Sequence, residues 1–269
     1  MTERIKEAGR VTPIISVGNV TAGYRDEIII EDVSFRVFAG EVFAILGRSG
    51  CGKTTLFKAV MGLLGIHGGE VTIDGEKVIP LSEGGSAQVL RKIGVLFQSG
   101  ALFSSMTLAE NVALPLRYHT DLPETTIEEL VRLKLFEVGL NGYEGLLPSE
   151  LSGGMQKRAA LARAMALDPK ILFFDEPSAG VDPVTSAQLD QMILQMNRSL
   201  GTTMVIVTHE LASVLTIADR VIMLDRDEKN IIGRGSPEEL ARSEDPRIRD
   251  FFRRSTAEKE SEETEQHEA

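Results

Sequence analysis

The sequence predicts an α/β fold built around a parallel β-sheet with helices on its faces. Three uninterrupted apolar runs, at residues 171–174, 204–207 and 221–224, have the composition of strands buried on both faces of such a sheet. The segments between these runs, at residues 184–200 and 210–217, are compatible with helices. This alternation of strands and helices predicts a doubly wound core with right-handed crossover connections.

The part of the chain before this core has the character of β-structure. Residues 14–20, 33–38 and 42–46 are short runs rich in β-branched residues, and glycines and charged turns separate them. Helical periodicity begins only after Gly52. We therefore expect a β-rich region to precede the first helix.

A middle stretch, roughly residues 107–166, is predicted to be helical. Thr125 and Thr126 stand three residues before Glu128 and Glu129, an arrangement that offers two overlapping capping boxes. Apolar residues then follow at helical spacing: Ile127, Leu130, Val131 and Val138.

Two short helices are predicted near the end of the chain. Ser236, Pro237 and Glu239 supply an N-cap, a proline at the first helical position and a glutamate at N3. A second helix within residues 245–254 would place three apolar side chains on one face, namely Ile248, Phe251 and Phe252. We expect this face to cover the edge of its own domain, and the alternative is a contact with a second protomer or a partner protein.

Composition and charge narrow the classes of function. With 42% hydrophobic and 26% charged residues among 269, the chain has the composition of a folded globular protein. Its net charge of -11 opposes binding to nucleic acid, because that affinity depends largely on Lys and Arg. Residues 255–269 are expected to form an acidic, disordered tail that carries Glu258, Glu260, Glu262, Glu263, Glu265 and Glu268.

The sequence offers no sign of secretion or of a membrane span. The N-terminal residues lack the apolar core of a signal peptide, and no run of about 18 apolar residues occurs. The single cysteine, Cys51, cannot form an intrachain disulfide, which suits a reducing cytosol. If the protein serves a membrane, we expect it to dock on partners that cross the bilayer.

Residues 47–54 match the phosphate-binding loop G-x-x-x-x-G-K-[ST], and they lie between a predicted strand and a predicted helix. The backbone N–H groups of such a loop and the positive end of the helix dipole surround phosphate oxygens. Lys53 is predicted to reach the terminal phosphates, and the Thr54 hydroxyl is predicted to bind Mg²⁺. The nucleotide-binding residues expected in this region are Gly47, Arg48, Ser49, Gly50, Cys51, Gly52, Lys53, Thr54 and Thr55.

Two acidic residues, Asp175 and Glu176, follow the apolar run at residues 171–174. They therefore lie at the carboxyl end of a buried strand, which is the edge where open α/β sheets bind ligands. Asp175 suits the coordination sphere of Mg²⁺, and Glu176 suits the polarisation of an attacking water. Two acids after a strand more often form a solvated turn, so this interpretation depends on the phosphate-binding loop.

A third segment distinguishes the chain from kinases, GTPases and other ATPases that share a phosphate-binding loop. It resembles the signature segment of the ABC ATPase family and consists of Leu151, Ser152, Gly153, Gly154 and Met155. The resemblance extends over nearly the whole chain, because further motif positions occur in the family's order. Tyr24 matches the aromatic that stacks on adenine, Gln98 the Q-loop, Asp182 the D-loop and His209 the switch histidine.

The resemblance implies an architecture and a mechanism. It implies a P-loop NTPase core with a parallel sheet, an N-terminal antiparallel β subdomain and a helical signature subdomain at about residues 100–166, within a domain at residues 14–254. Bound ATP and Mg²⁺ are implied, with Gln98 as a further Mg²⁺ ligand and a catalytic set of Glu176, His209, Lys53 and Gln98. The ATP would also be contacted across a homodimer by a second copy's Ser152, Gly153, Gly154 and Asp182.

Met155 replaces the glutamine that is usual at the fifth signature position. Together with residues 96–103, this variant resembles the ATPases of the Mla and MCE-associated lipid-transport systems. That resemblance implies phospholipid as cargo and a peripheral location on the cytoplasmic face of the inner membrane. The implied partners are transmembrane permease subunits, an MCE-domain lipid-binding protein and, in some systems, a STAS-domain protein.

Two rival functions stay open at this stage. One is an ABC transporter ATPase for another substrate, and the other is a soluble ABC ATPase without a role in transport. The single cassette, the lack of a long coiled coil and the acidic charge weigh against the second rival.

Two hypotheses concern residues near the nucleotide. Residues 98–108 carry no charge, so Ala101, Leu102 and Phe103 are candidates for docking to a permease, although a buried loop is the simpler interpretation. Cys51 lies beside Lys53 at a helix N-terminus, which favours a reactive thiolate, whereas an inward-pointing thiol would have a raised pKa.

Overall fold

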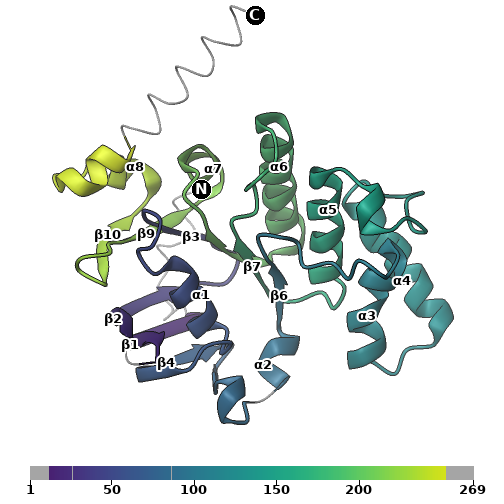
Figure 1. The fold of residues 1–269 in the computed structure, drawn as a ribbon, viewed down its shortest axis with the longest axis horizontal. Helices are drawn as coiled ribbons and strands as arrows, with labels where there is room; N and C mark the ends of the chain where they lie inside the picture. The colour runs from purple at the N-terminus through teal and green to yellow at the C-terminus, as the bar shows by residue number, and fades with distance from the viewer. Residues whose placement is uncertain (1–11, 26, 86, 253–269) are drawn as a thin grey trace, which may run out of the picture.

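The computed structural model describes residues 12–25, 27–85 and 87–252, and two sheets organise them. The antiparallel sheet has the strand order β2-β1-β4-β5. Its strands are β1 (Ile15–Tyr24), β2 (Glu27–Val37), β4 (Ile66–Ile73) and β5 (Glu76–Lys77). The expected N-terminal antiparallel subdomain is therefore confirmed, and Figure 1 shows it on the side of the molecule opposite α3 and α4.

The second sheet has the strand order β10-β9-β3-β8-β7-β6. The strands from β9 to β6 pair in parallel, and β10 joins the edge antiparallel to β9. Their bounds are β3 (Val42–Leu46), β6 (Ile93–Leu96), β7 (Ile171–Asp175), β8 (Thr203–Val207), β9 (Arg220–Leu224) and β10 (Ile231–Gly235). The predicted parallel core is confirmed, and β3, β7 and β8 are buried over their whole length, as continuous apolar runs require.

Alternating residues of the parallel strands fill two different cores. Phe43, Phe173 and Val205 face the antiparallel sheet and helix α1 (Lys53–Val60). Leu172 and Phe174 face the opposite side, where helices cover the sheet. The covering helices include α3 (Leu108–His119), α4 (Glu124–Glu137), α5 (Gly153–Ala164) and α6 (Pro183–Leu200). The parallel sheet is thus the middle layer, and its carboxyl edge lies where the predicted site residues occur.

The helical group α3 to α5 confirms the predicted helical middle stretch, and Figure 1 shows it to one side of the parallel sheet. The predicted caps on α4 are wrong. This helix begins at Glu124, its N-cap is Pro123 and no side chain caps it, so Thr125 and Thr126 lie inside the first turn. Pro123 has the non-helical backbone of an N-cap, with a φ of -59° and a ψ of 147°, so the helix has already begun where the two threonines occur. A complete capping box occurs instead on α3, between Thr107 and Glu110.

Three labelled α-helices are shorter, namely α2 (Ala87–Arg91), α7 (Leu211–Ile217) and α8 (Pro237–Ala241). The predicted capping box of Ser236 with Glu239 is present on α8. Residues 246–252 are helical, and Ile248 and Phe252 are buried against α7, α8 and β9. The expectation that this segment covers its own domain is confirmed, while residues 253–254 and the predicted acidic tail at 255–269 lie outside the described residues.

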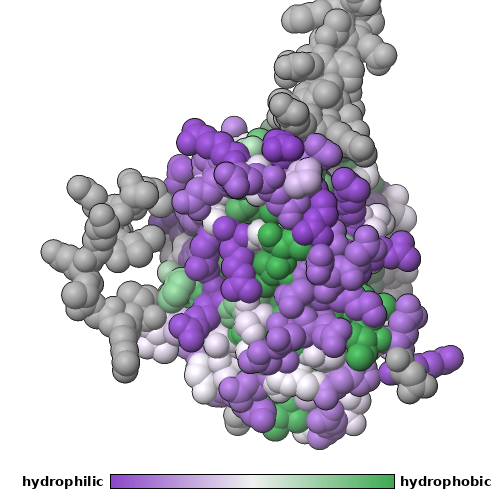
Figure 2. Space-filling view, turned by 90° about the vertical axis from the view of Figure 1, so that its left-hand side faces the viewer, coloured by the Kyte–Doolittle hydropathy of each residue, from purple (hydrophilic) through white to green (hydrophobic). Residues whose placement is uncertain are grey.

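No helix within the described ranges is long and apolar enough to cross a bilayer. The face that carries β10, α8 and the edge of the antiparallel sheet is mostly hydrophilic (Figure 2), and its hydrophobic residues gather in a few small patches.

Candidate functional site

The phosphate-binding loop connects β3 to α1, as the sequence predicts. Its last glycine, Gly52, is the N-cap of α1 and has a φ of 99°, a left-handed conformation that favours glycine. A Cβ atom there would also come within 2.6 Å of Ile30 Cγ2. The Lys53 side chain is buried and its Nζ donates to the carbonyls of Gly47 at 2.8 Å and Arg48 at 3.3 Å. The loop therefore closes around an ammonium group at the N-terminus of α1, the end of a helix that attracts an anion.

An open cavity of about 800 Å³ lies against this loop. Most residues predicted for the site line this cavity, although they come from different elements. They are Tyr24, Arg48, Ser49, Gly50, Gly52, Lys53, Thr54, Thr55, Gln98, Glu176 and His209. Two further side chains, Ile29 and Phe251, line the cavity and were not predicted to do so. Both are apolar, and they share the cavity wall with Tyr24, a residue that is 46% exposed.

Asp175 ends β7 and is 8% exposed. Its Oδ1 atom is buried and has no hydrogen-bond partner among the described residues. Burial raises the pKa of this carboxyl, and the neighbouring Glu176 charge raises it further, while Lys58, Lys53 and Lys157 oppose the shift. A buried carboxylate oxygen without a donor fits a bound cation, because Mg²⁺ takes oxygen ligands and would supply the missing charge. Thr54, at the start of α1, offers an exposed hydroxyl on the cavity wall.

Glu176 has a left-handed backbone, with a φ of 48° that is uncommon for a residue with a side chain. Its N–H donates to the Val207 carbonyl at 2.8 Å, which connects β7 to β8 beyond the regular ladder. Its Oε2 lies 2.9 Å from Nδ1 of His209 and accepts from the His209 backbone N–H at 3.3 Å. The Glu176 side chain is 13% exposed and the His209 side chain 66% exposed. One carboxylate therefore faces the cavity with a histidine held beside it.

Gln98 follows β6, and its exposed side chain lines the cavity. Its backbone carbonyl accepts from Nζ of Lys157, a residue of α5 that the sequence analysis did not select. Burial lowers the pKa of this ammonium, although the Asp175 and Glu176 charges oppose the shift. No local sequence signal identifies Lys157, because its contact depends on how α5 packs against the ends of β6 and β7.

The signature segment forms the start of α5 but does not line this cavity. Ser152 is the N-cap, its Oγ accepts from the Met155 N–H at 3.3 Å, and no acid occupies the first turn. A Cβ atom on Gly154 would come within 2.5 Å of Thr185 Cγ2, so this glycine allows α5 and α6 to approach. Thr185 in turn donates to Asp182 from its N–H at 3.0 Å and its hydroxyl at 2.6 Å. Asp182 thus caps α6, and the signature and D-loop positions form a second group of predicted residues.

The family model described as ABC transporter matches residues 30–179, more than half of the chain. The chain belongs to the ABC transporter family. It is 43% identical over 240 residues to the intermembrane phospholipid transport system ATP-binding protein MlaF of Haemophilus influenzae, with 89% of this chain and 90% of that protein covered. It is 43% identical over 238 residues to the probable ribonucleotide transport ATP-binding protein mkl of Mycobacterium tuberculosis, with 88% of this chain and 66% of that protein covered.

Solved structures give the same result for the fold. The dimeric post-hydrolysis state of the ATP-binding cassette MJ0796, bound to ADP and Pi, matches with a TM-score of 0.74 and 29% identity. The match covers 83% of this chain and 98% of that chain. The chain described here is therefore an ABC ATPase in fold and in sequence.

Cys51 of this ABC ATPase points into the core. It is 2% exposed and packs with residues of α1 and the antiparallel sheet. Burial raises the pKa of its thiol, and this effect outweighs the opposing charge of Lys53. The hypothesis of a reactive thiolate is therefore not supported. Besides the signature and D-loop residues, the predicted residues Cys51, Gly47 and Asp175 do not line the cavity.

The uncharged segment after Gln98 is partly open to solvent. Phe103 is 49% exposed and lies under the Arg163 guanidinium, whereas Leu102 packs against the helical core. Arg163 donates to the carbonyls of Gly100 at 2.9 Å and Ala101 at 2.8 Å. The segment is therefore held in place with an aromatic ring exposed, which suits the docking hypothesis better than the alternative of a buried loop.

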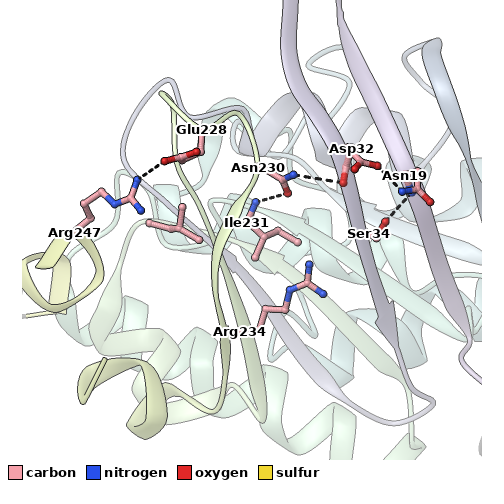
Figure 3. A pocket seen from close by; sticks show the side chains of 9 residues that line it. Asn19, Asp32, Ser34, Glu228, Asn230, Ile231, Arg234 and Arg247 are labelled. Carbon is pink, nitrogen blue, oxygen red and sulfur yellow. Dashed lines mark hydrogen bonds and ion pairs between the residues drawn. The ribbon is translucent and has the colours of Figure 1, made fainter. Parts of the chain in front are cut away.

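A second polar cavity of about 560 Å³ lies between β10 and the antiparallel sheet (Figure 3). Its charged side chains are largely paired with one another or with neighbours. Arg247 donates to Glu228 at 3.1 Å and to Asp245, and Asn19 bonds both Asp32 and Ser34. No residue predicted for the nucleotide site lines this cavity, whereas eleven of them line the cavity at the phosphate-binding loop.

Proposed function

We propose that the cavity at the phosphate-binding loop binds ATP with Mg²⁺ and that its residues catalyse hydrolysis. The buried oxygen of Asp175, which has no hydrogen-bond partner among the described residues, is the observation that carries the proposal, and the charge of Lys53 in the loop acts on this carboxyl. Asp175, the Thr54 hydroxyl and the Gln98 side chain would hold the ion, which would neutralise phosphate charge. Lys53 and the loop N–H groups bind the phosphates, and Tyr24 stacks on the base.

In this proposal Glu176 acts on the attacking water. Its carboxylate accepts a hydrogen bond from the water and orients it, and His209 fixes the carboxylate through the contact at 2.9 Å. The left-handed backbone at Glu176 sets the direction of the side chain, and strain of this kind is common at functional sites. Arg48, Ser49 and Thr55 form the remaining wall against the phosphates.

A second copy of the chain completes the site. Ser152, Gly153 and Gly154 open a helix without an acid in its first turn, and such an N-terminus attracts an anion. They do not line the cavity of their own chain, which supports a homodimer with each signature segment over the partner's nucleotide. Asp182 accompanies them at the start of α6, and the dimeric post-hydrolysis state of the cassette MJ0796, bound to ADP and Pi, supports this arrangement.

We further propose that the dimer drives transport of phospholipid through permease subunits at the cytoplasmic face of the inner membrane. The similarity to MlaF over 89% of the chain supports this cargo. An MCE-domain protein and a STAS-domain protein are the accessory partners that go with it. Ribonucleotide transport is the second candidate, and the name of the mycobacterial relative favours it. The proposed ATPase domain covers residues 14–254, with its helical subdomain at about 100–166.

One experiment separates these cargoes. The chain is isolated from membranes with its bound subunits, which are identified, and the complex is placed in liposomes with labelled phospholipid or ribonucleotide. ATP-dependent movement of phospholipid that Glu176→Gln abolishes is the expected result. Movement of ribonucleotide alone would replace the phospholipid proposal with the second candidate, and isolation without any membrane subunit would contradict both.

A further inference from the structure

We propose that Lys157 is a positioning residue, whose ammonium group connects the loop of Gln98 to the loop of Glu176 and so fixes these two site residues relative to each other. This inference rests on the roles proposed above for Gln98 and Glu176. Lys157 lies on α5 and does not itself line the cavity, so it would act through the two loops that do.

The contacts of Lys157 are unusual for a lysine. Its Nζ donates to the backbone carbonyl of Gln98 and, at 3.5 Å, to that of Glu176. The residue is 7% exposed, so water competes little for these bonds. A buried ammonium costs free energy unless its donors find acceptors, and here two backbone carbonyls of residues that line the cavity accept from it.

Lys134 offers a direct comparison within the same helical group. Its exposure is 3%, and its ammonium pairs with the carboxylates of Glu137 at 3.3 Å and Asp168 at 2.6 Å. That arrangement is the common way to bury a lysine, because opposite charges pair. Lys157 instead donates to two peptide carbonyls, which belong to Gln98, proposed to hold the ion, and to Glu176, proposed to orient the attacking water. The carboxylate partners of Lys134 therefore suit a role in stability, whereas the carbonyl partners of Lys157 suit a role in positioning the two loops.

The hydrogen bond from Lys157 matters most for the backbone conformation of Glu176. Its φ of 48° is held by bonds on both sides of the residue. The N–H donates to Val207 at 2.8 Å, and the carbonyl accepts from the Ala179 N–H at 3.1 Å as well as from Lys157. Loss of Lys157 would leave the Gln98 carbonyl without this donor and weaken the restraint on Glu176. A shift of about 1 Å at reacting groups can lower a rate by about 100-fold.

The position of Lys157 on α5 adds a link to the signature segment. Ser152 caps this helix and Lys157 lies in its second turn, so one rigid element carries both. A movement of α5 when a second copy binds would therefore act on Gln98 and Glu176 of the same chain through one ammonium group.

The test uses the full-length chain and compares Lys157→Met with Lys134→Met. Methionine keeps much of the side-chain volume and removes the charge and the donors in both cases. We expect Lys157→Met to lower kcat by about tenfold to 100-fold and to leave KM for ATP within about twofold. Lys134→Met should lower the unfolding temperature at least as much and leave kcat within about twofold. Lys157→Arg, which keeps charge and donors, should recover kcat to within about fivefold of the natural protein.

Three outcomes would overturn the inference. One is a near-normal kcat in Lys157→Met, another is a rise in KM that accounts for the whole loss, and the third is a Lys157→Arg variant as slow as Lys157→Met. If Lys157→Met fails to fold, Lys157→Gln replaces it with the same criteria. Glu176→Gln is assayed in parallel. If Glu176→Gln is inactive while Lys157→Met is active, only the positioning role of Lys157 is rejected. If both variants hydrolyse ATP normally, the roles proposed for the site residues are rejected.

Discussion

Substitution of Glu176 by glutamine isolates the effect of one carboxylate on hydrolysis. Glutamine has the same length, and its amide oxygen can still accept from the His209 N–H groups that now bind Oε2. The fold around the site should therefore persist. A group that accepts a proton from the nucleophile contributes about 100-fold to 10,000-fold to a rate, which equals about 2.7 to 5.5 kcal/mol in activation free energy.

Nucleotide binding should survive the same substitution. The Glu176 charge raises the pKa of Asp175, so its removal favours the ionised form of the carboxylate proposed to bind Mg²⁺. We therefore expect affinity for MgATP to stay equal or to increase, while kcat falls by at least about 100-fold. Phosphate release measures the rate, and equilibrium binding of a labelled nucleotide measures the affinity.

A matched control excludes a general effect of losing a buried carboxylate. Glu41 is 12% exposed in its side chain, close to the 13% of Glu176, and it pairs with Arg220 away from the cavity. Glu41→Gln should lower stability but leave hydrolysis within about threefold of the natural protein. If Glu176→Gln hydrolyses ATP at a rate similar to Glu41→Gln, the role assigned to Glu176 is wrong.

Three further predictions follow from the site. Lys53→Ala should weaken MgATP binding by about 10-fold to 150-fold, because a charged donor to phosphate is lost, and calorimetry would reveal unchanged affinity if Lys53 has no such role. The raised pKa of Cys51 means less thiolate at neutral pH, so alkylation of the native chain should be slow with or without MgATP. Alkylation of the chain unfolded in urea should be fast. Rapid labelling of the native chain that MgATP blocks would restore the reactive-thiol hypothesis. Phe103→Asp should leave hydrolysis by the isolated chain intact and reduce recovery of membrane subunits, whereas Leu102→Asp should destabilise the chain itself; full recovery with Phe103→Asp would reject docking at this ring.

The sequence predicts the buried strands well because a short, continuous apolar run can form few structures other than a buried strand. Residues 42–46 form β3 with the same bounds, and the run at 171–174 forms β7 with one more residue. Strand β4 was not predicted, since its residues Gly68 and Gly69 interrupt the β-branched pattern. Strand β6 has only four residues, which is too short for a pattern to stand out. Pairing with neighbouring strands, rather than local propensity, forms both of them.

The residues of the candidate site likewise fall into those that the local sequence predicts and those that depend on tertiary packing. Lys53 and Glu176 could be predicted because each occurs in a motif whose chemistry requires that residue type. Phe251 and Lys157 could not, because their positions at the site depend on packing between elements far apart in the chain. For Cys51 the sequence allows either an inward-pointing thiol or a reactive thiolate at the nucleotide. Only the packing of α1 against the antiparallel sheet decides between these two hypotheses.

The mass of the Glu176→Gln chain with and without MgATP tests most directly whether two copies complete one site. We predict the mass of one chain without nucleotide and of two chains with MgATP, because without hydrolysis the ATP-bound dimer does not dissociate. Ser152→Asp added to this variant keeps a good N-cap for α5 but places a negative charge at the proposed phosphate contact, so the mass should stay that of one chain. A double variant that still forms dimers with MgATP, or a Glu176→Gln chain that binds MgATP and remains single, would contradict the account.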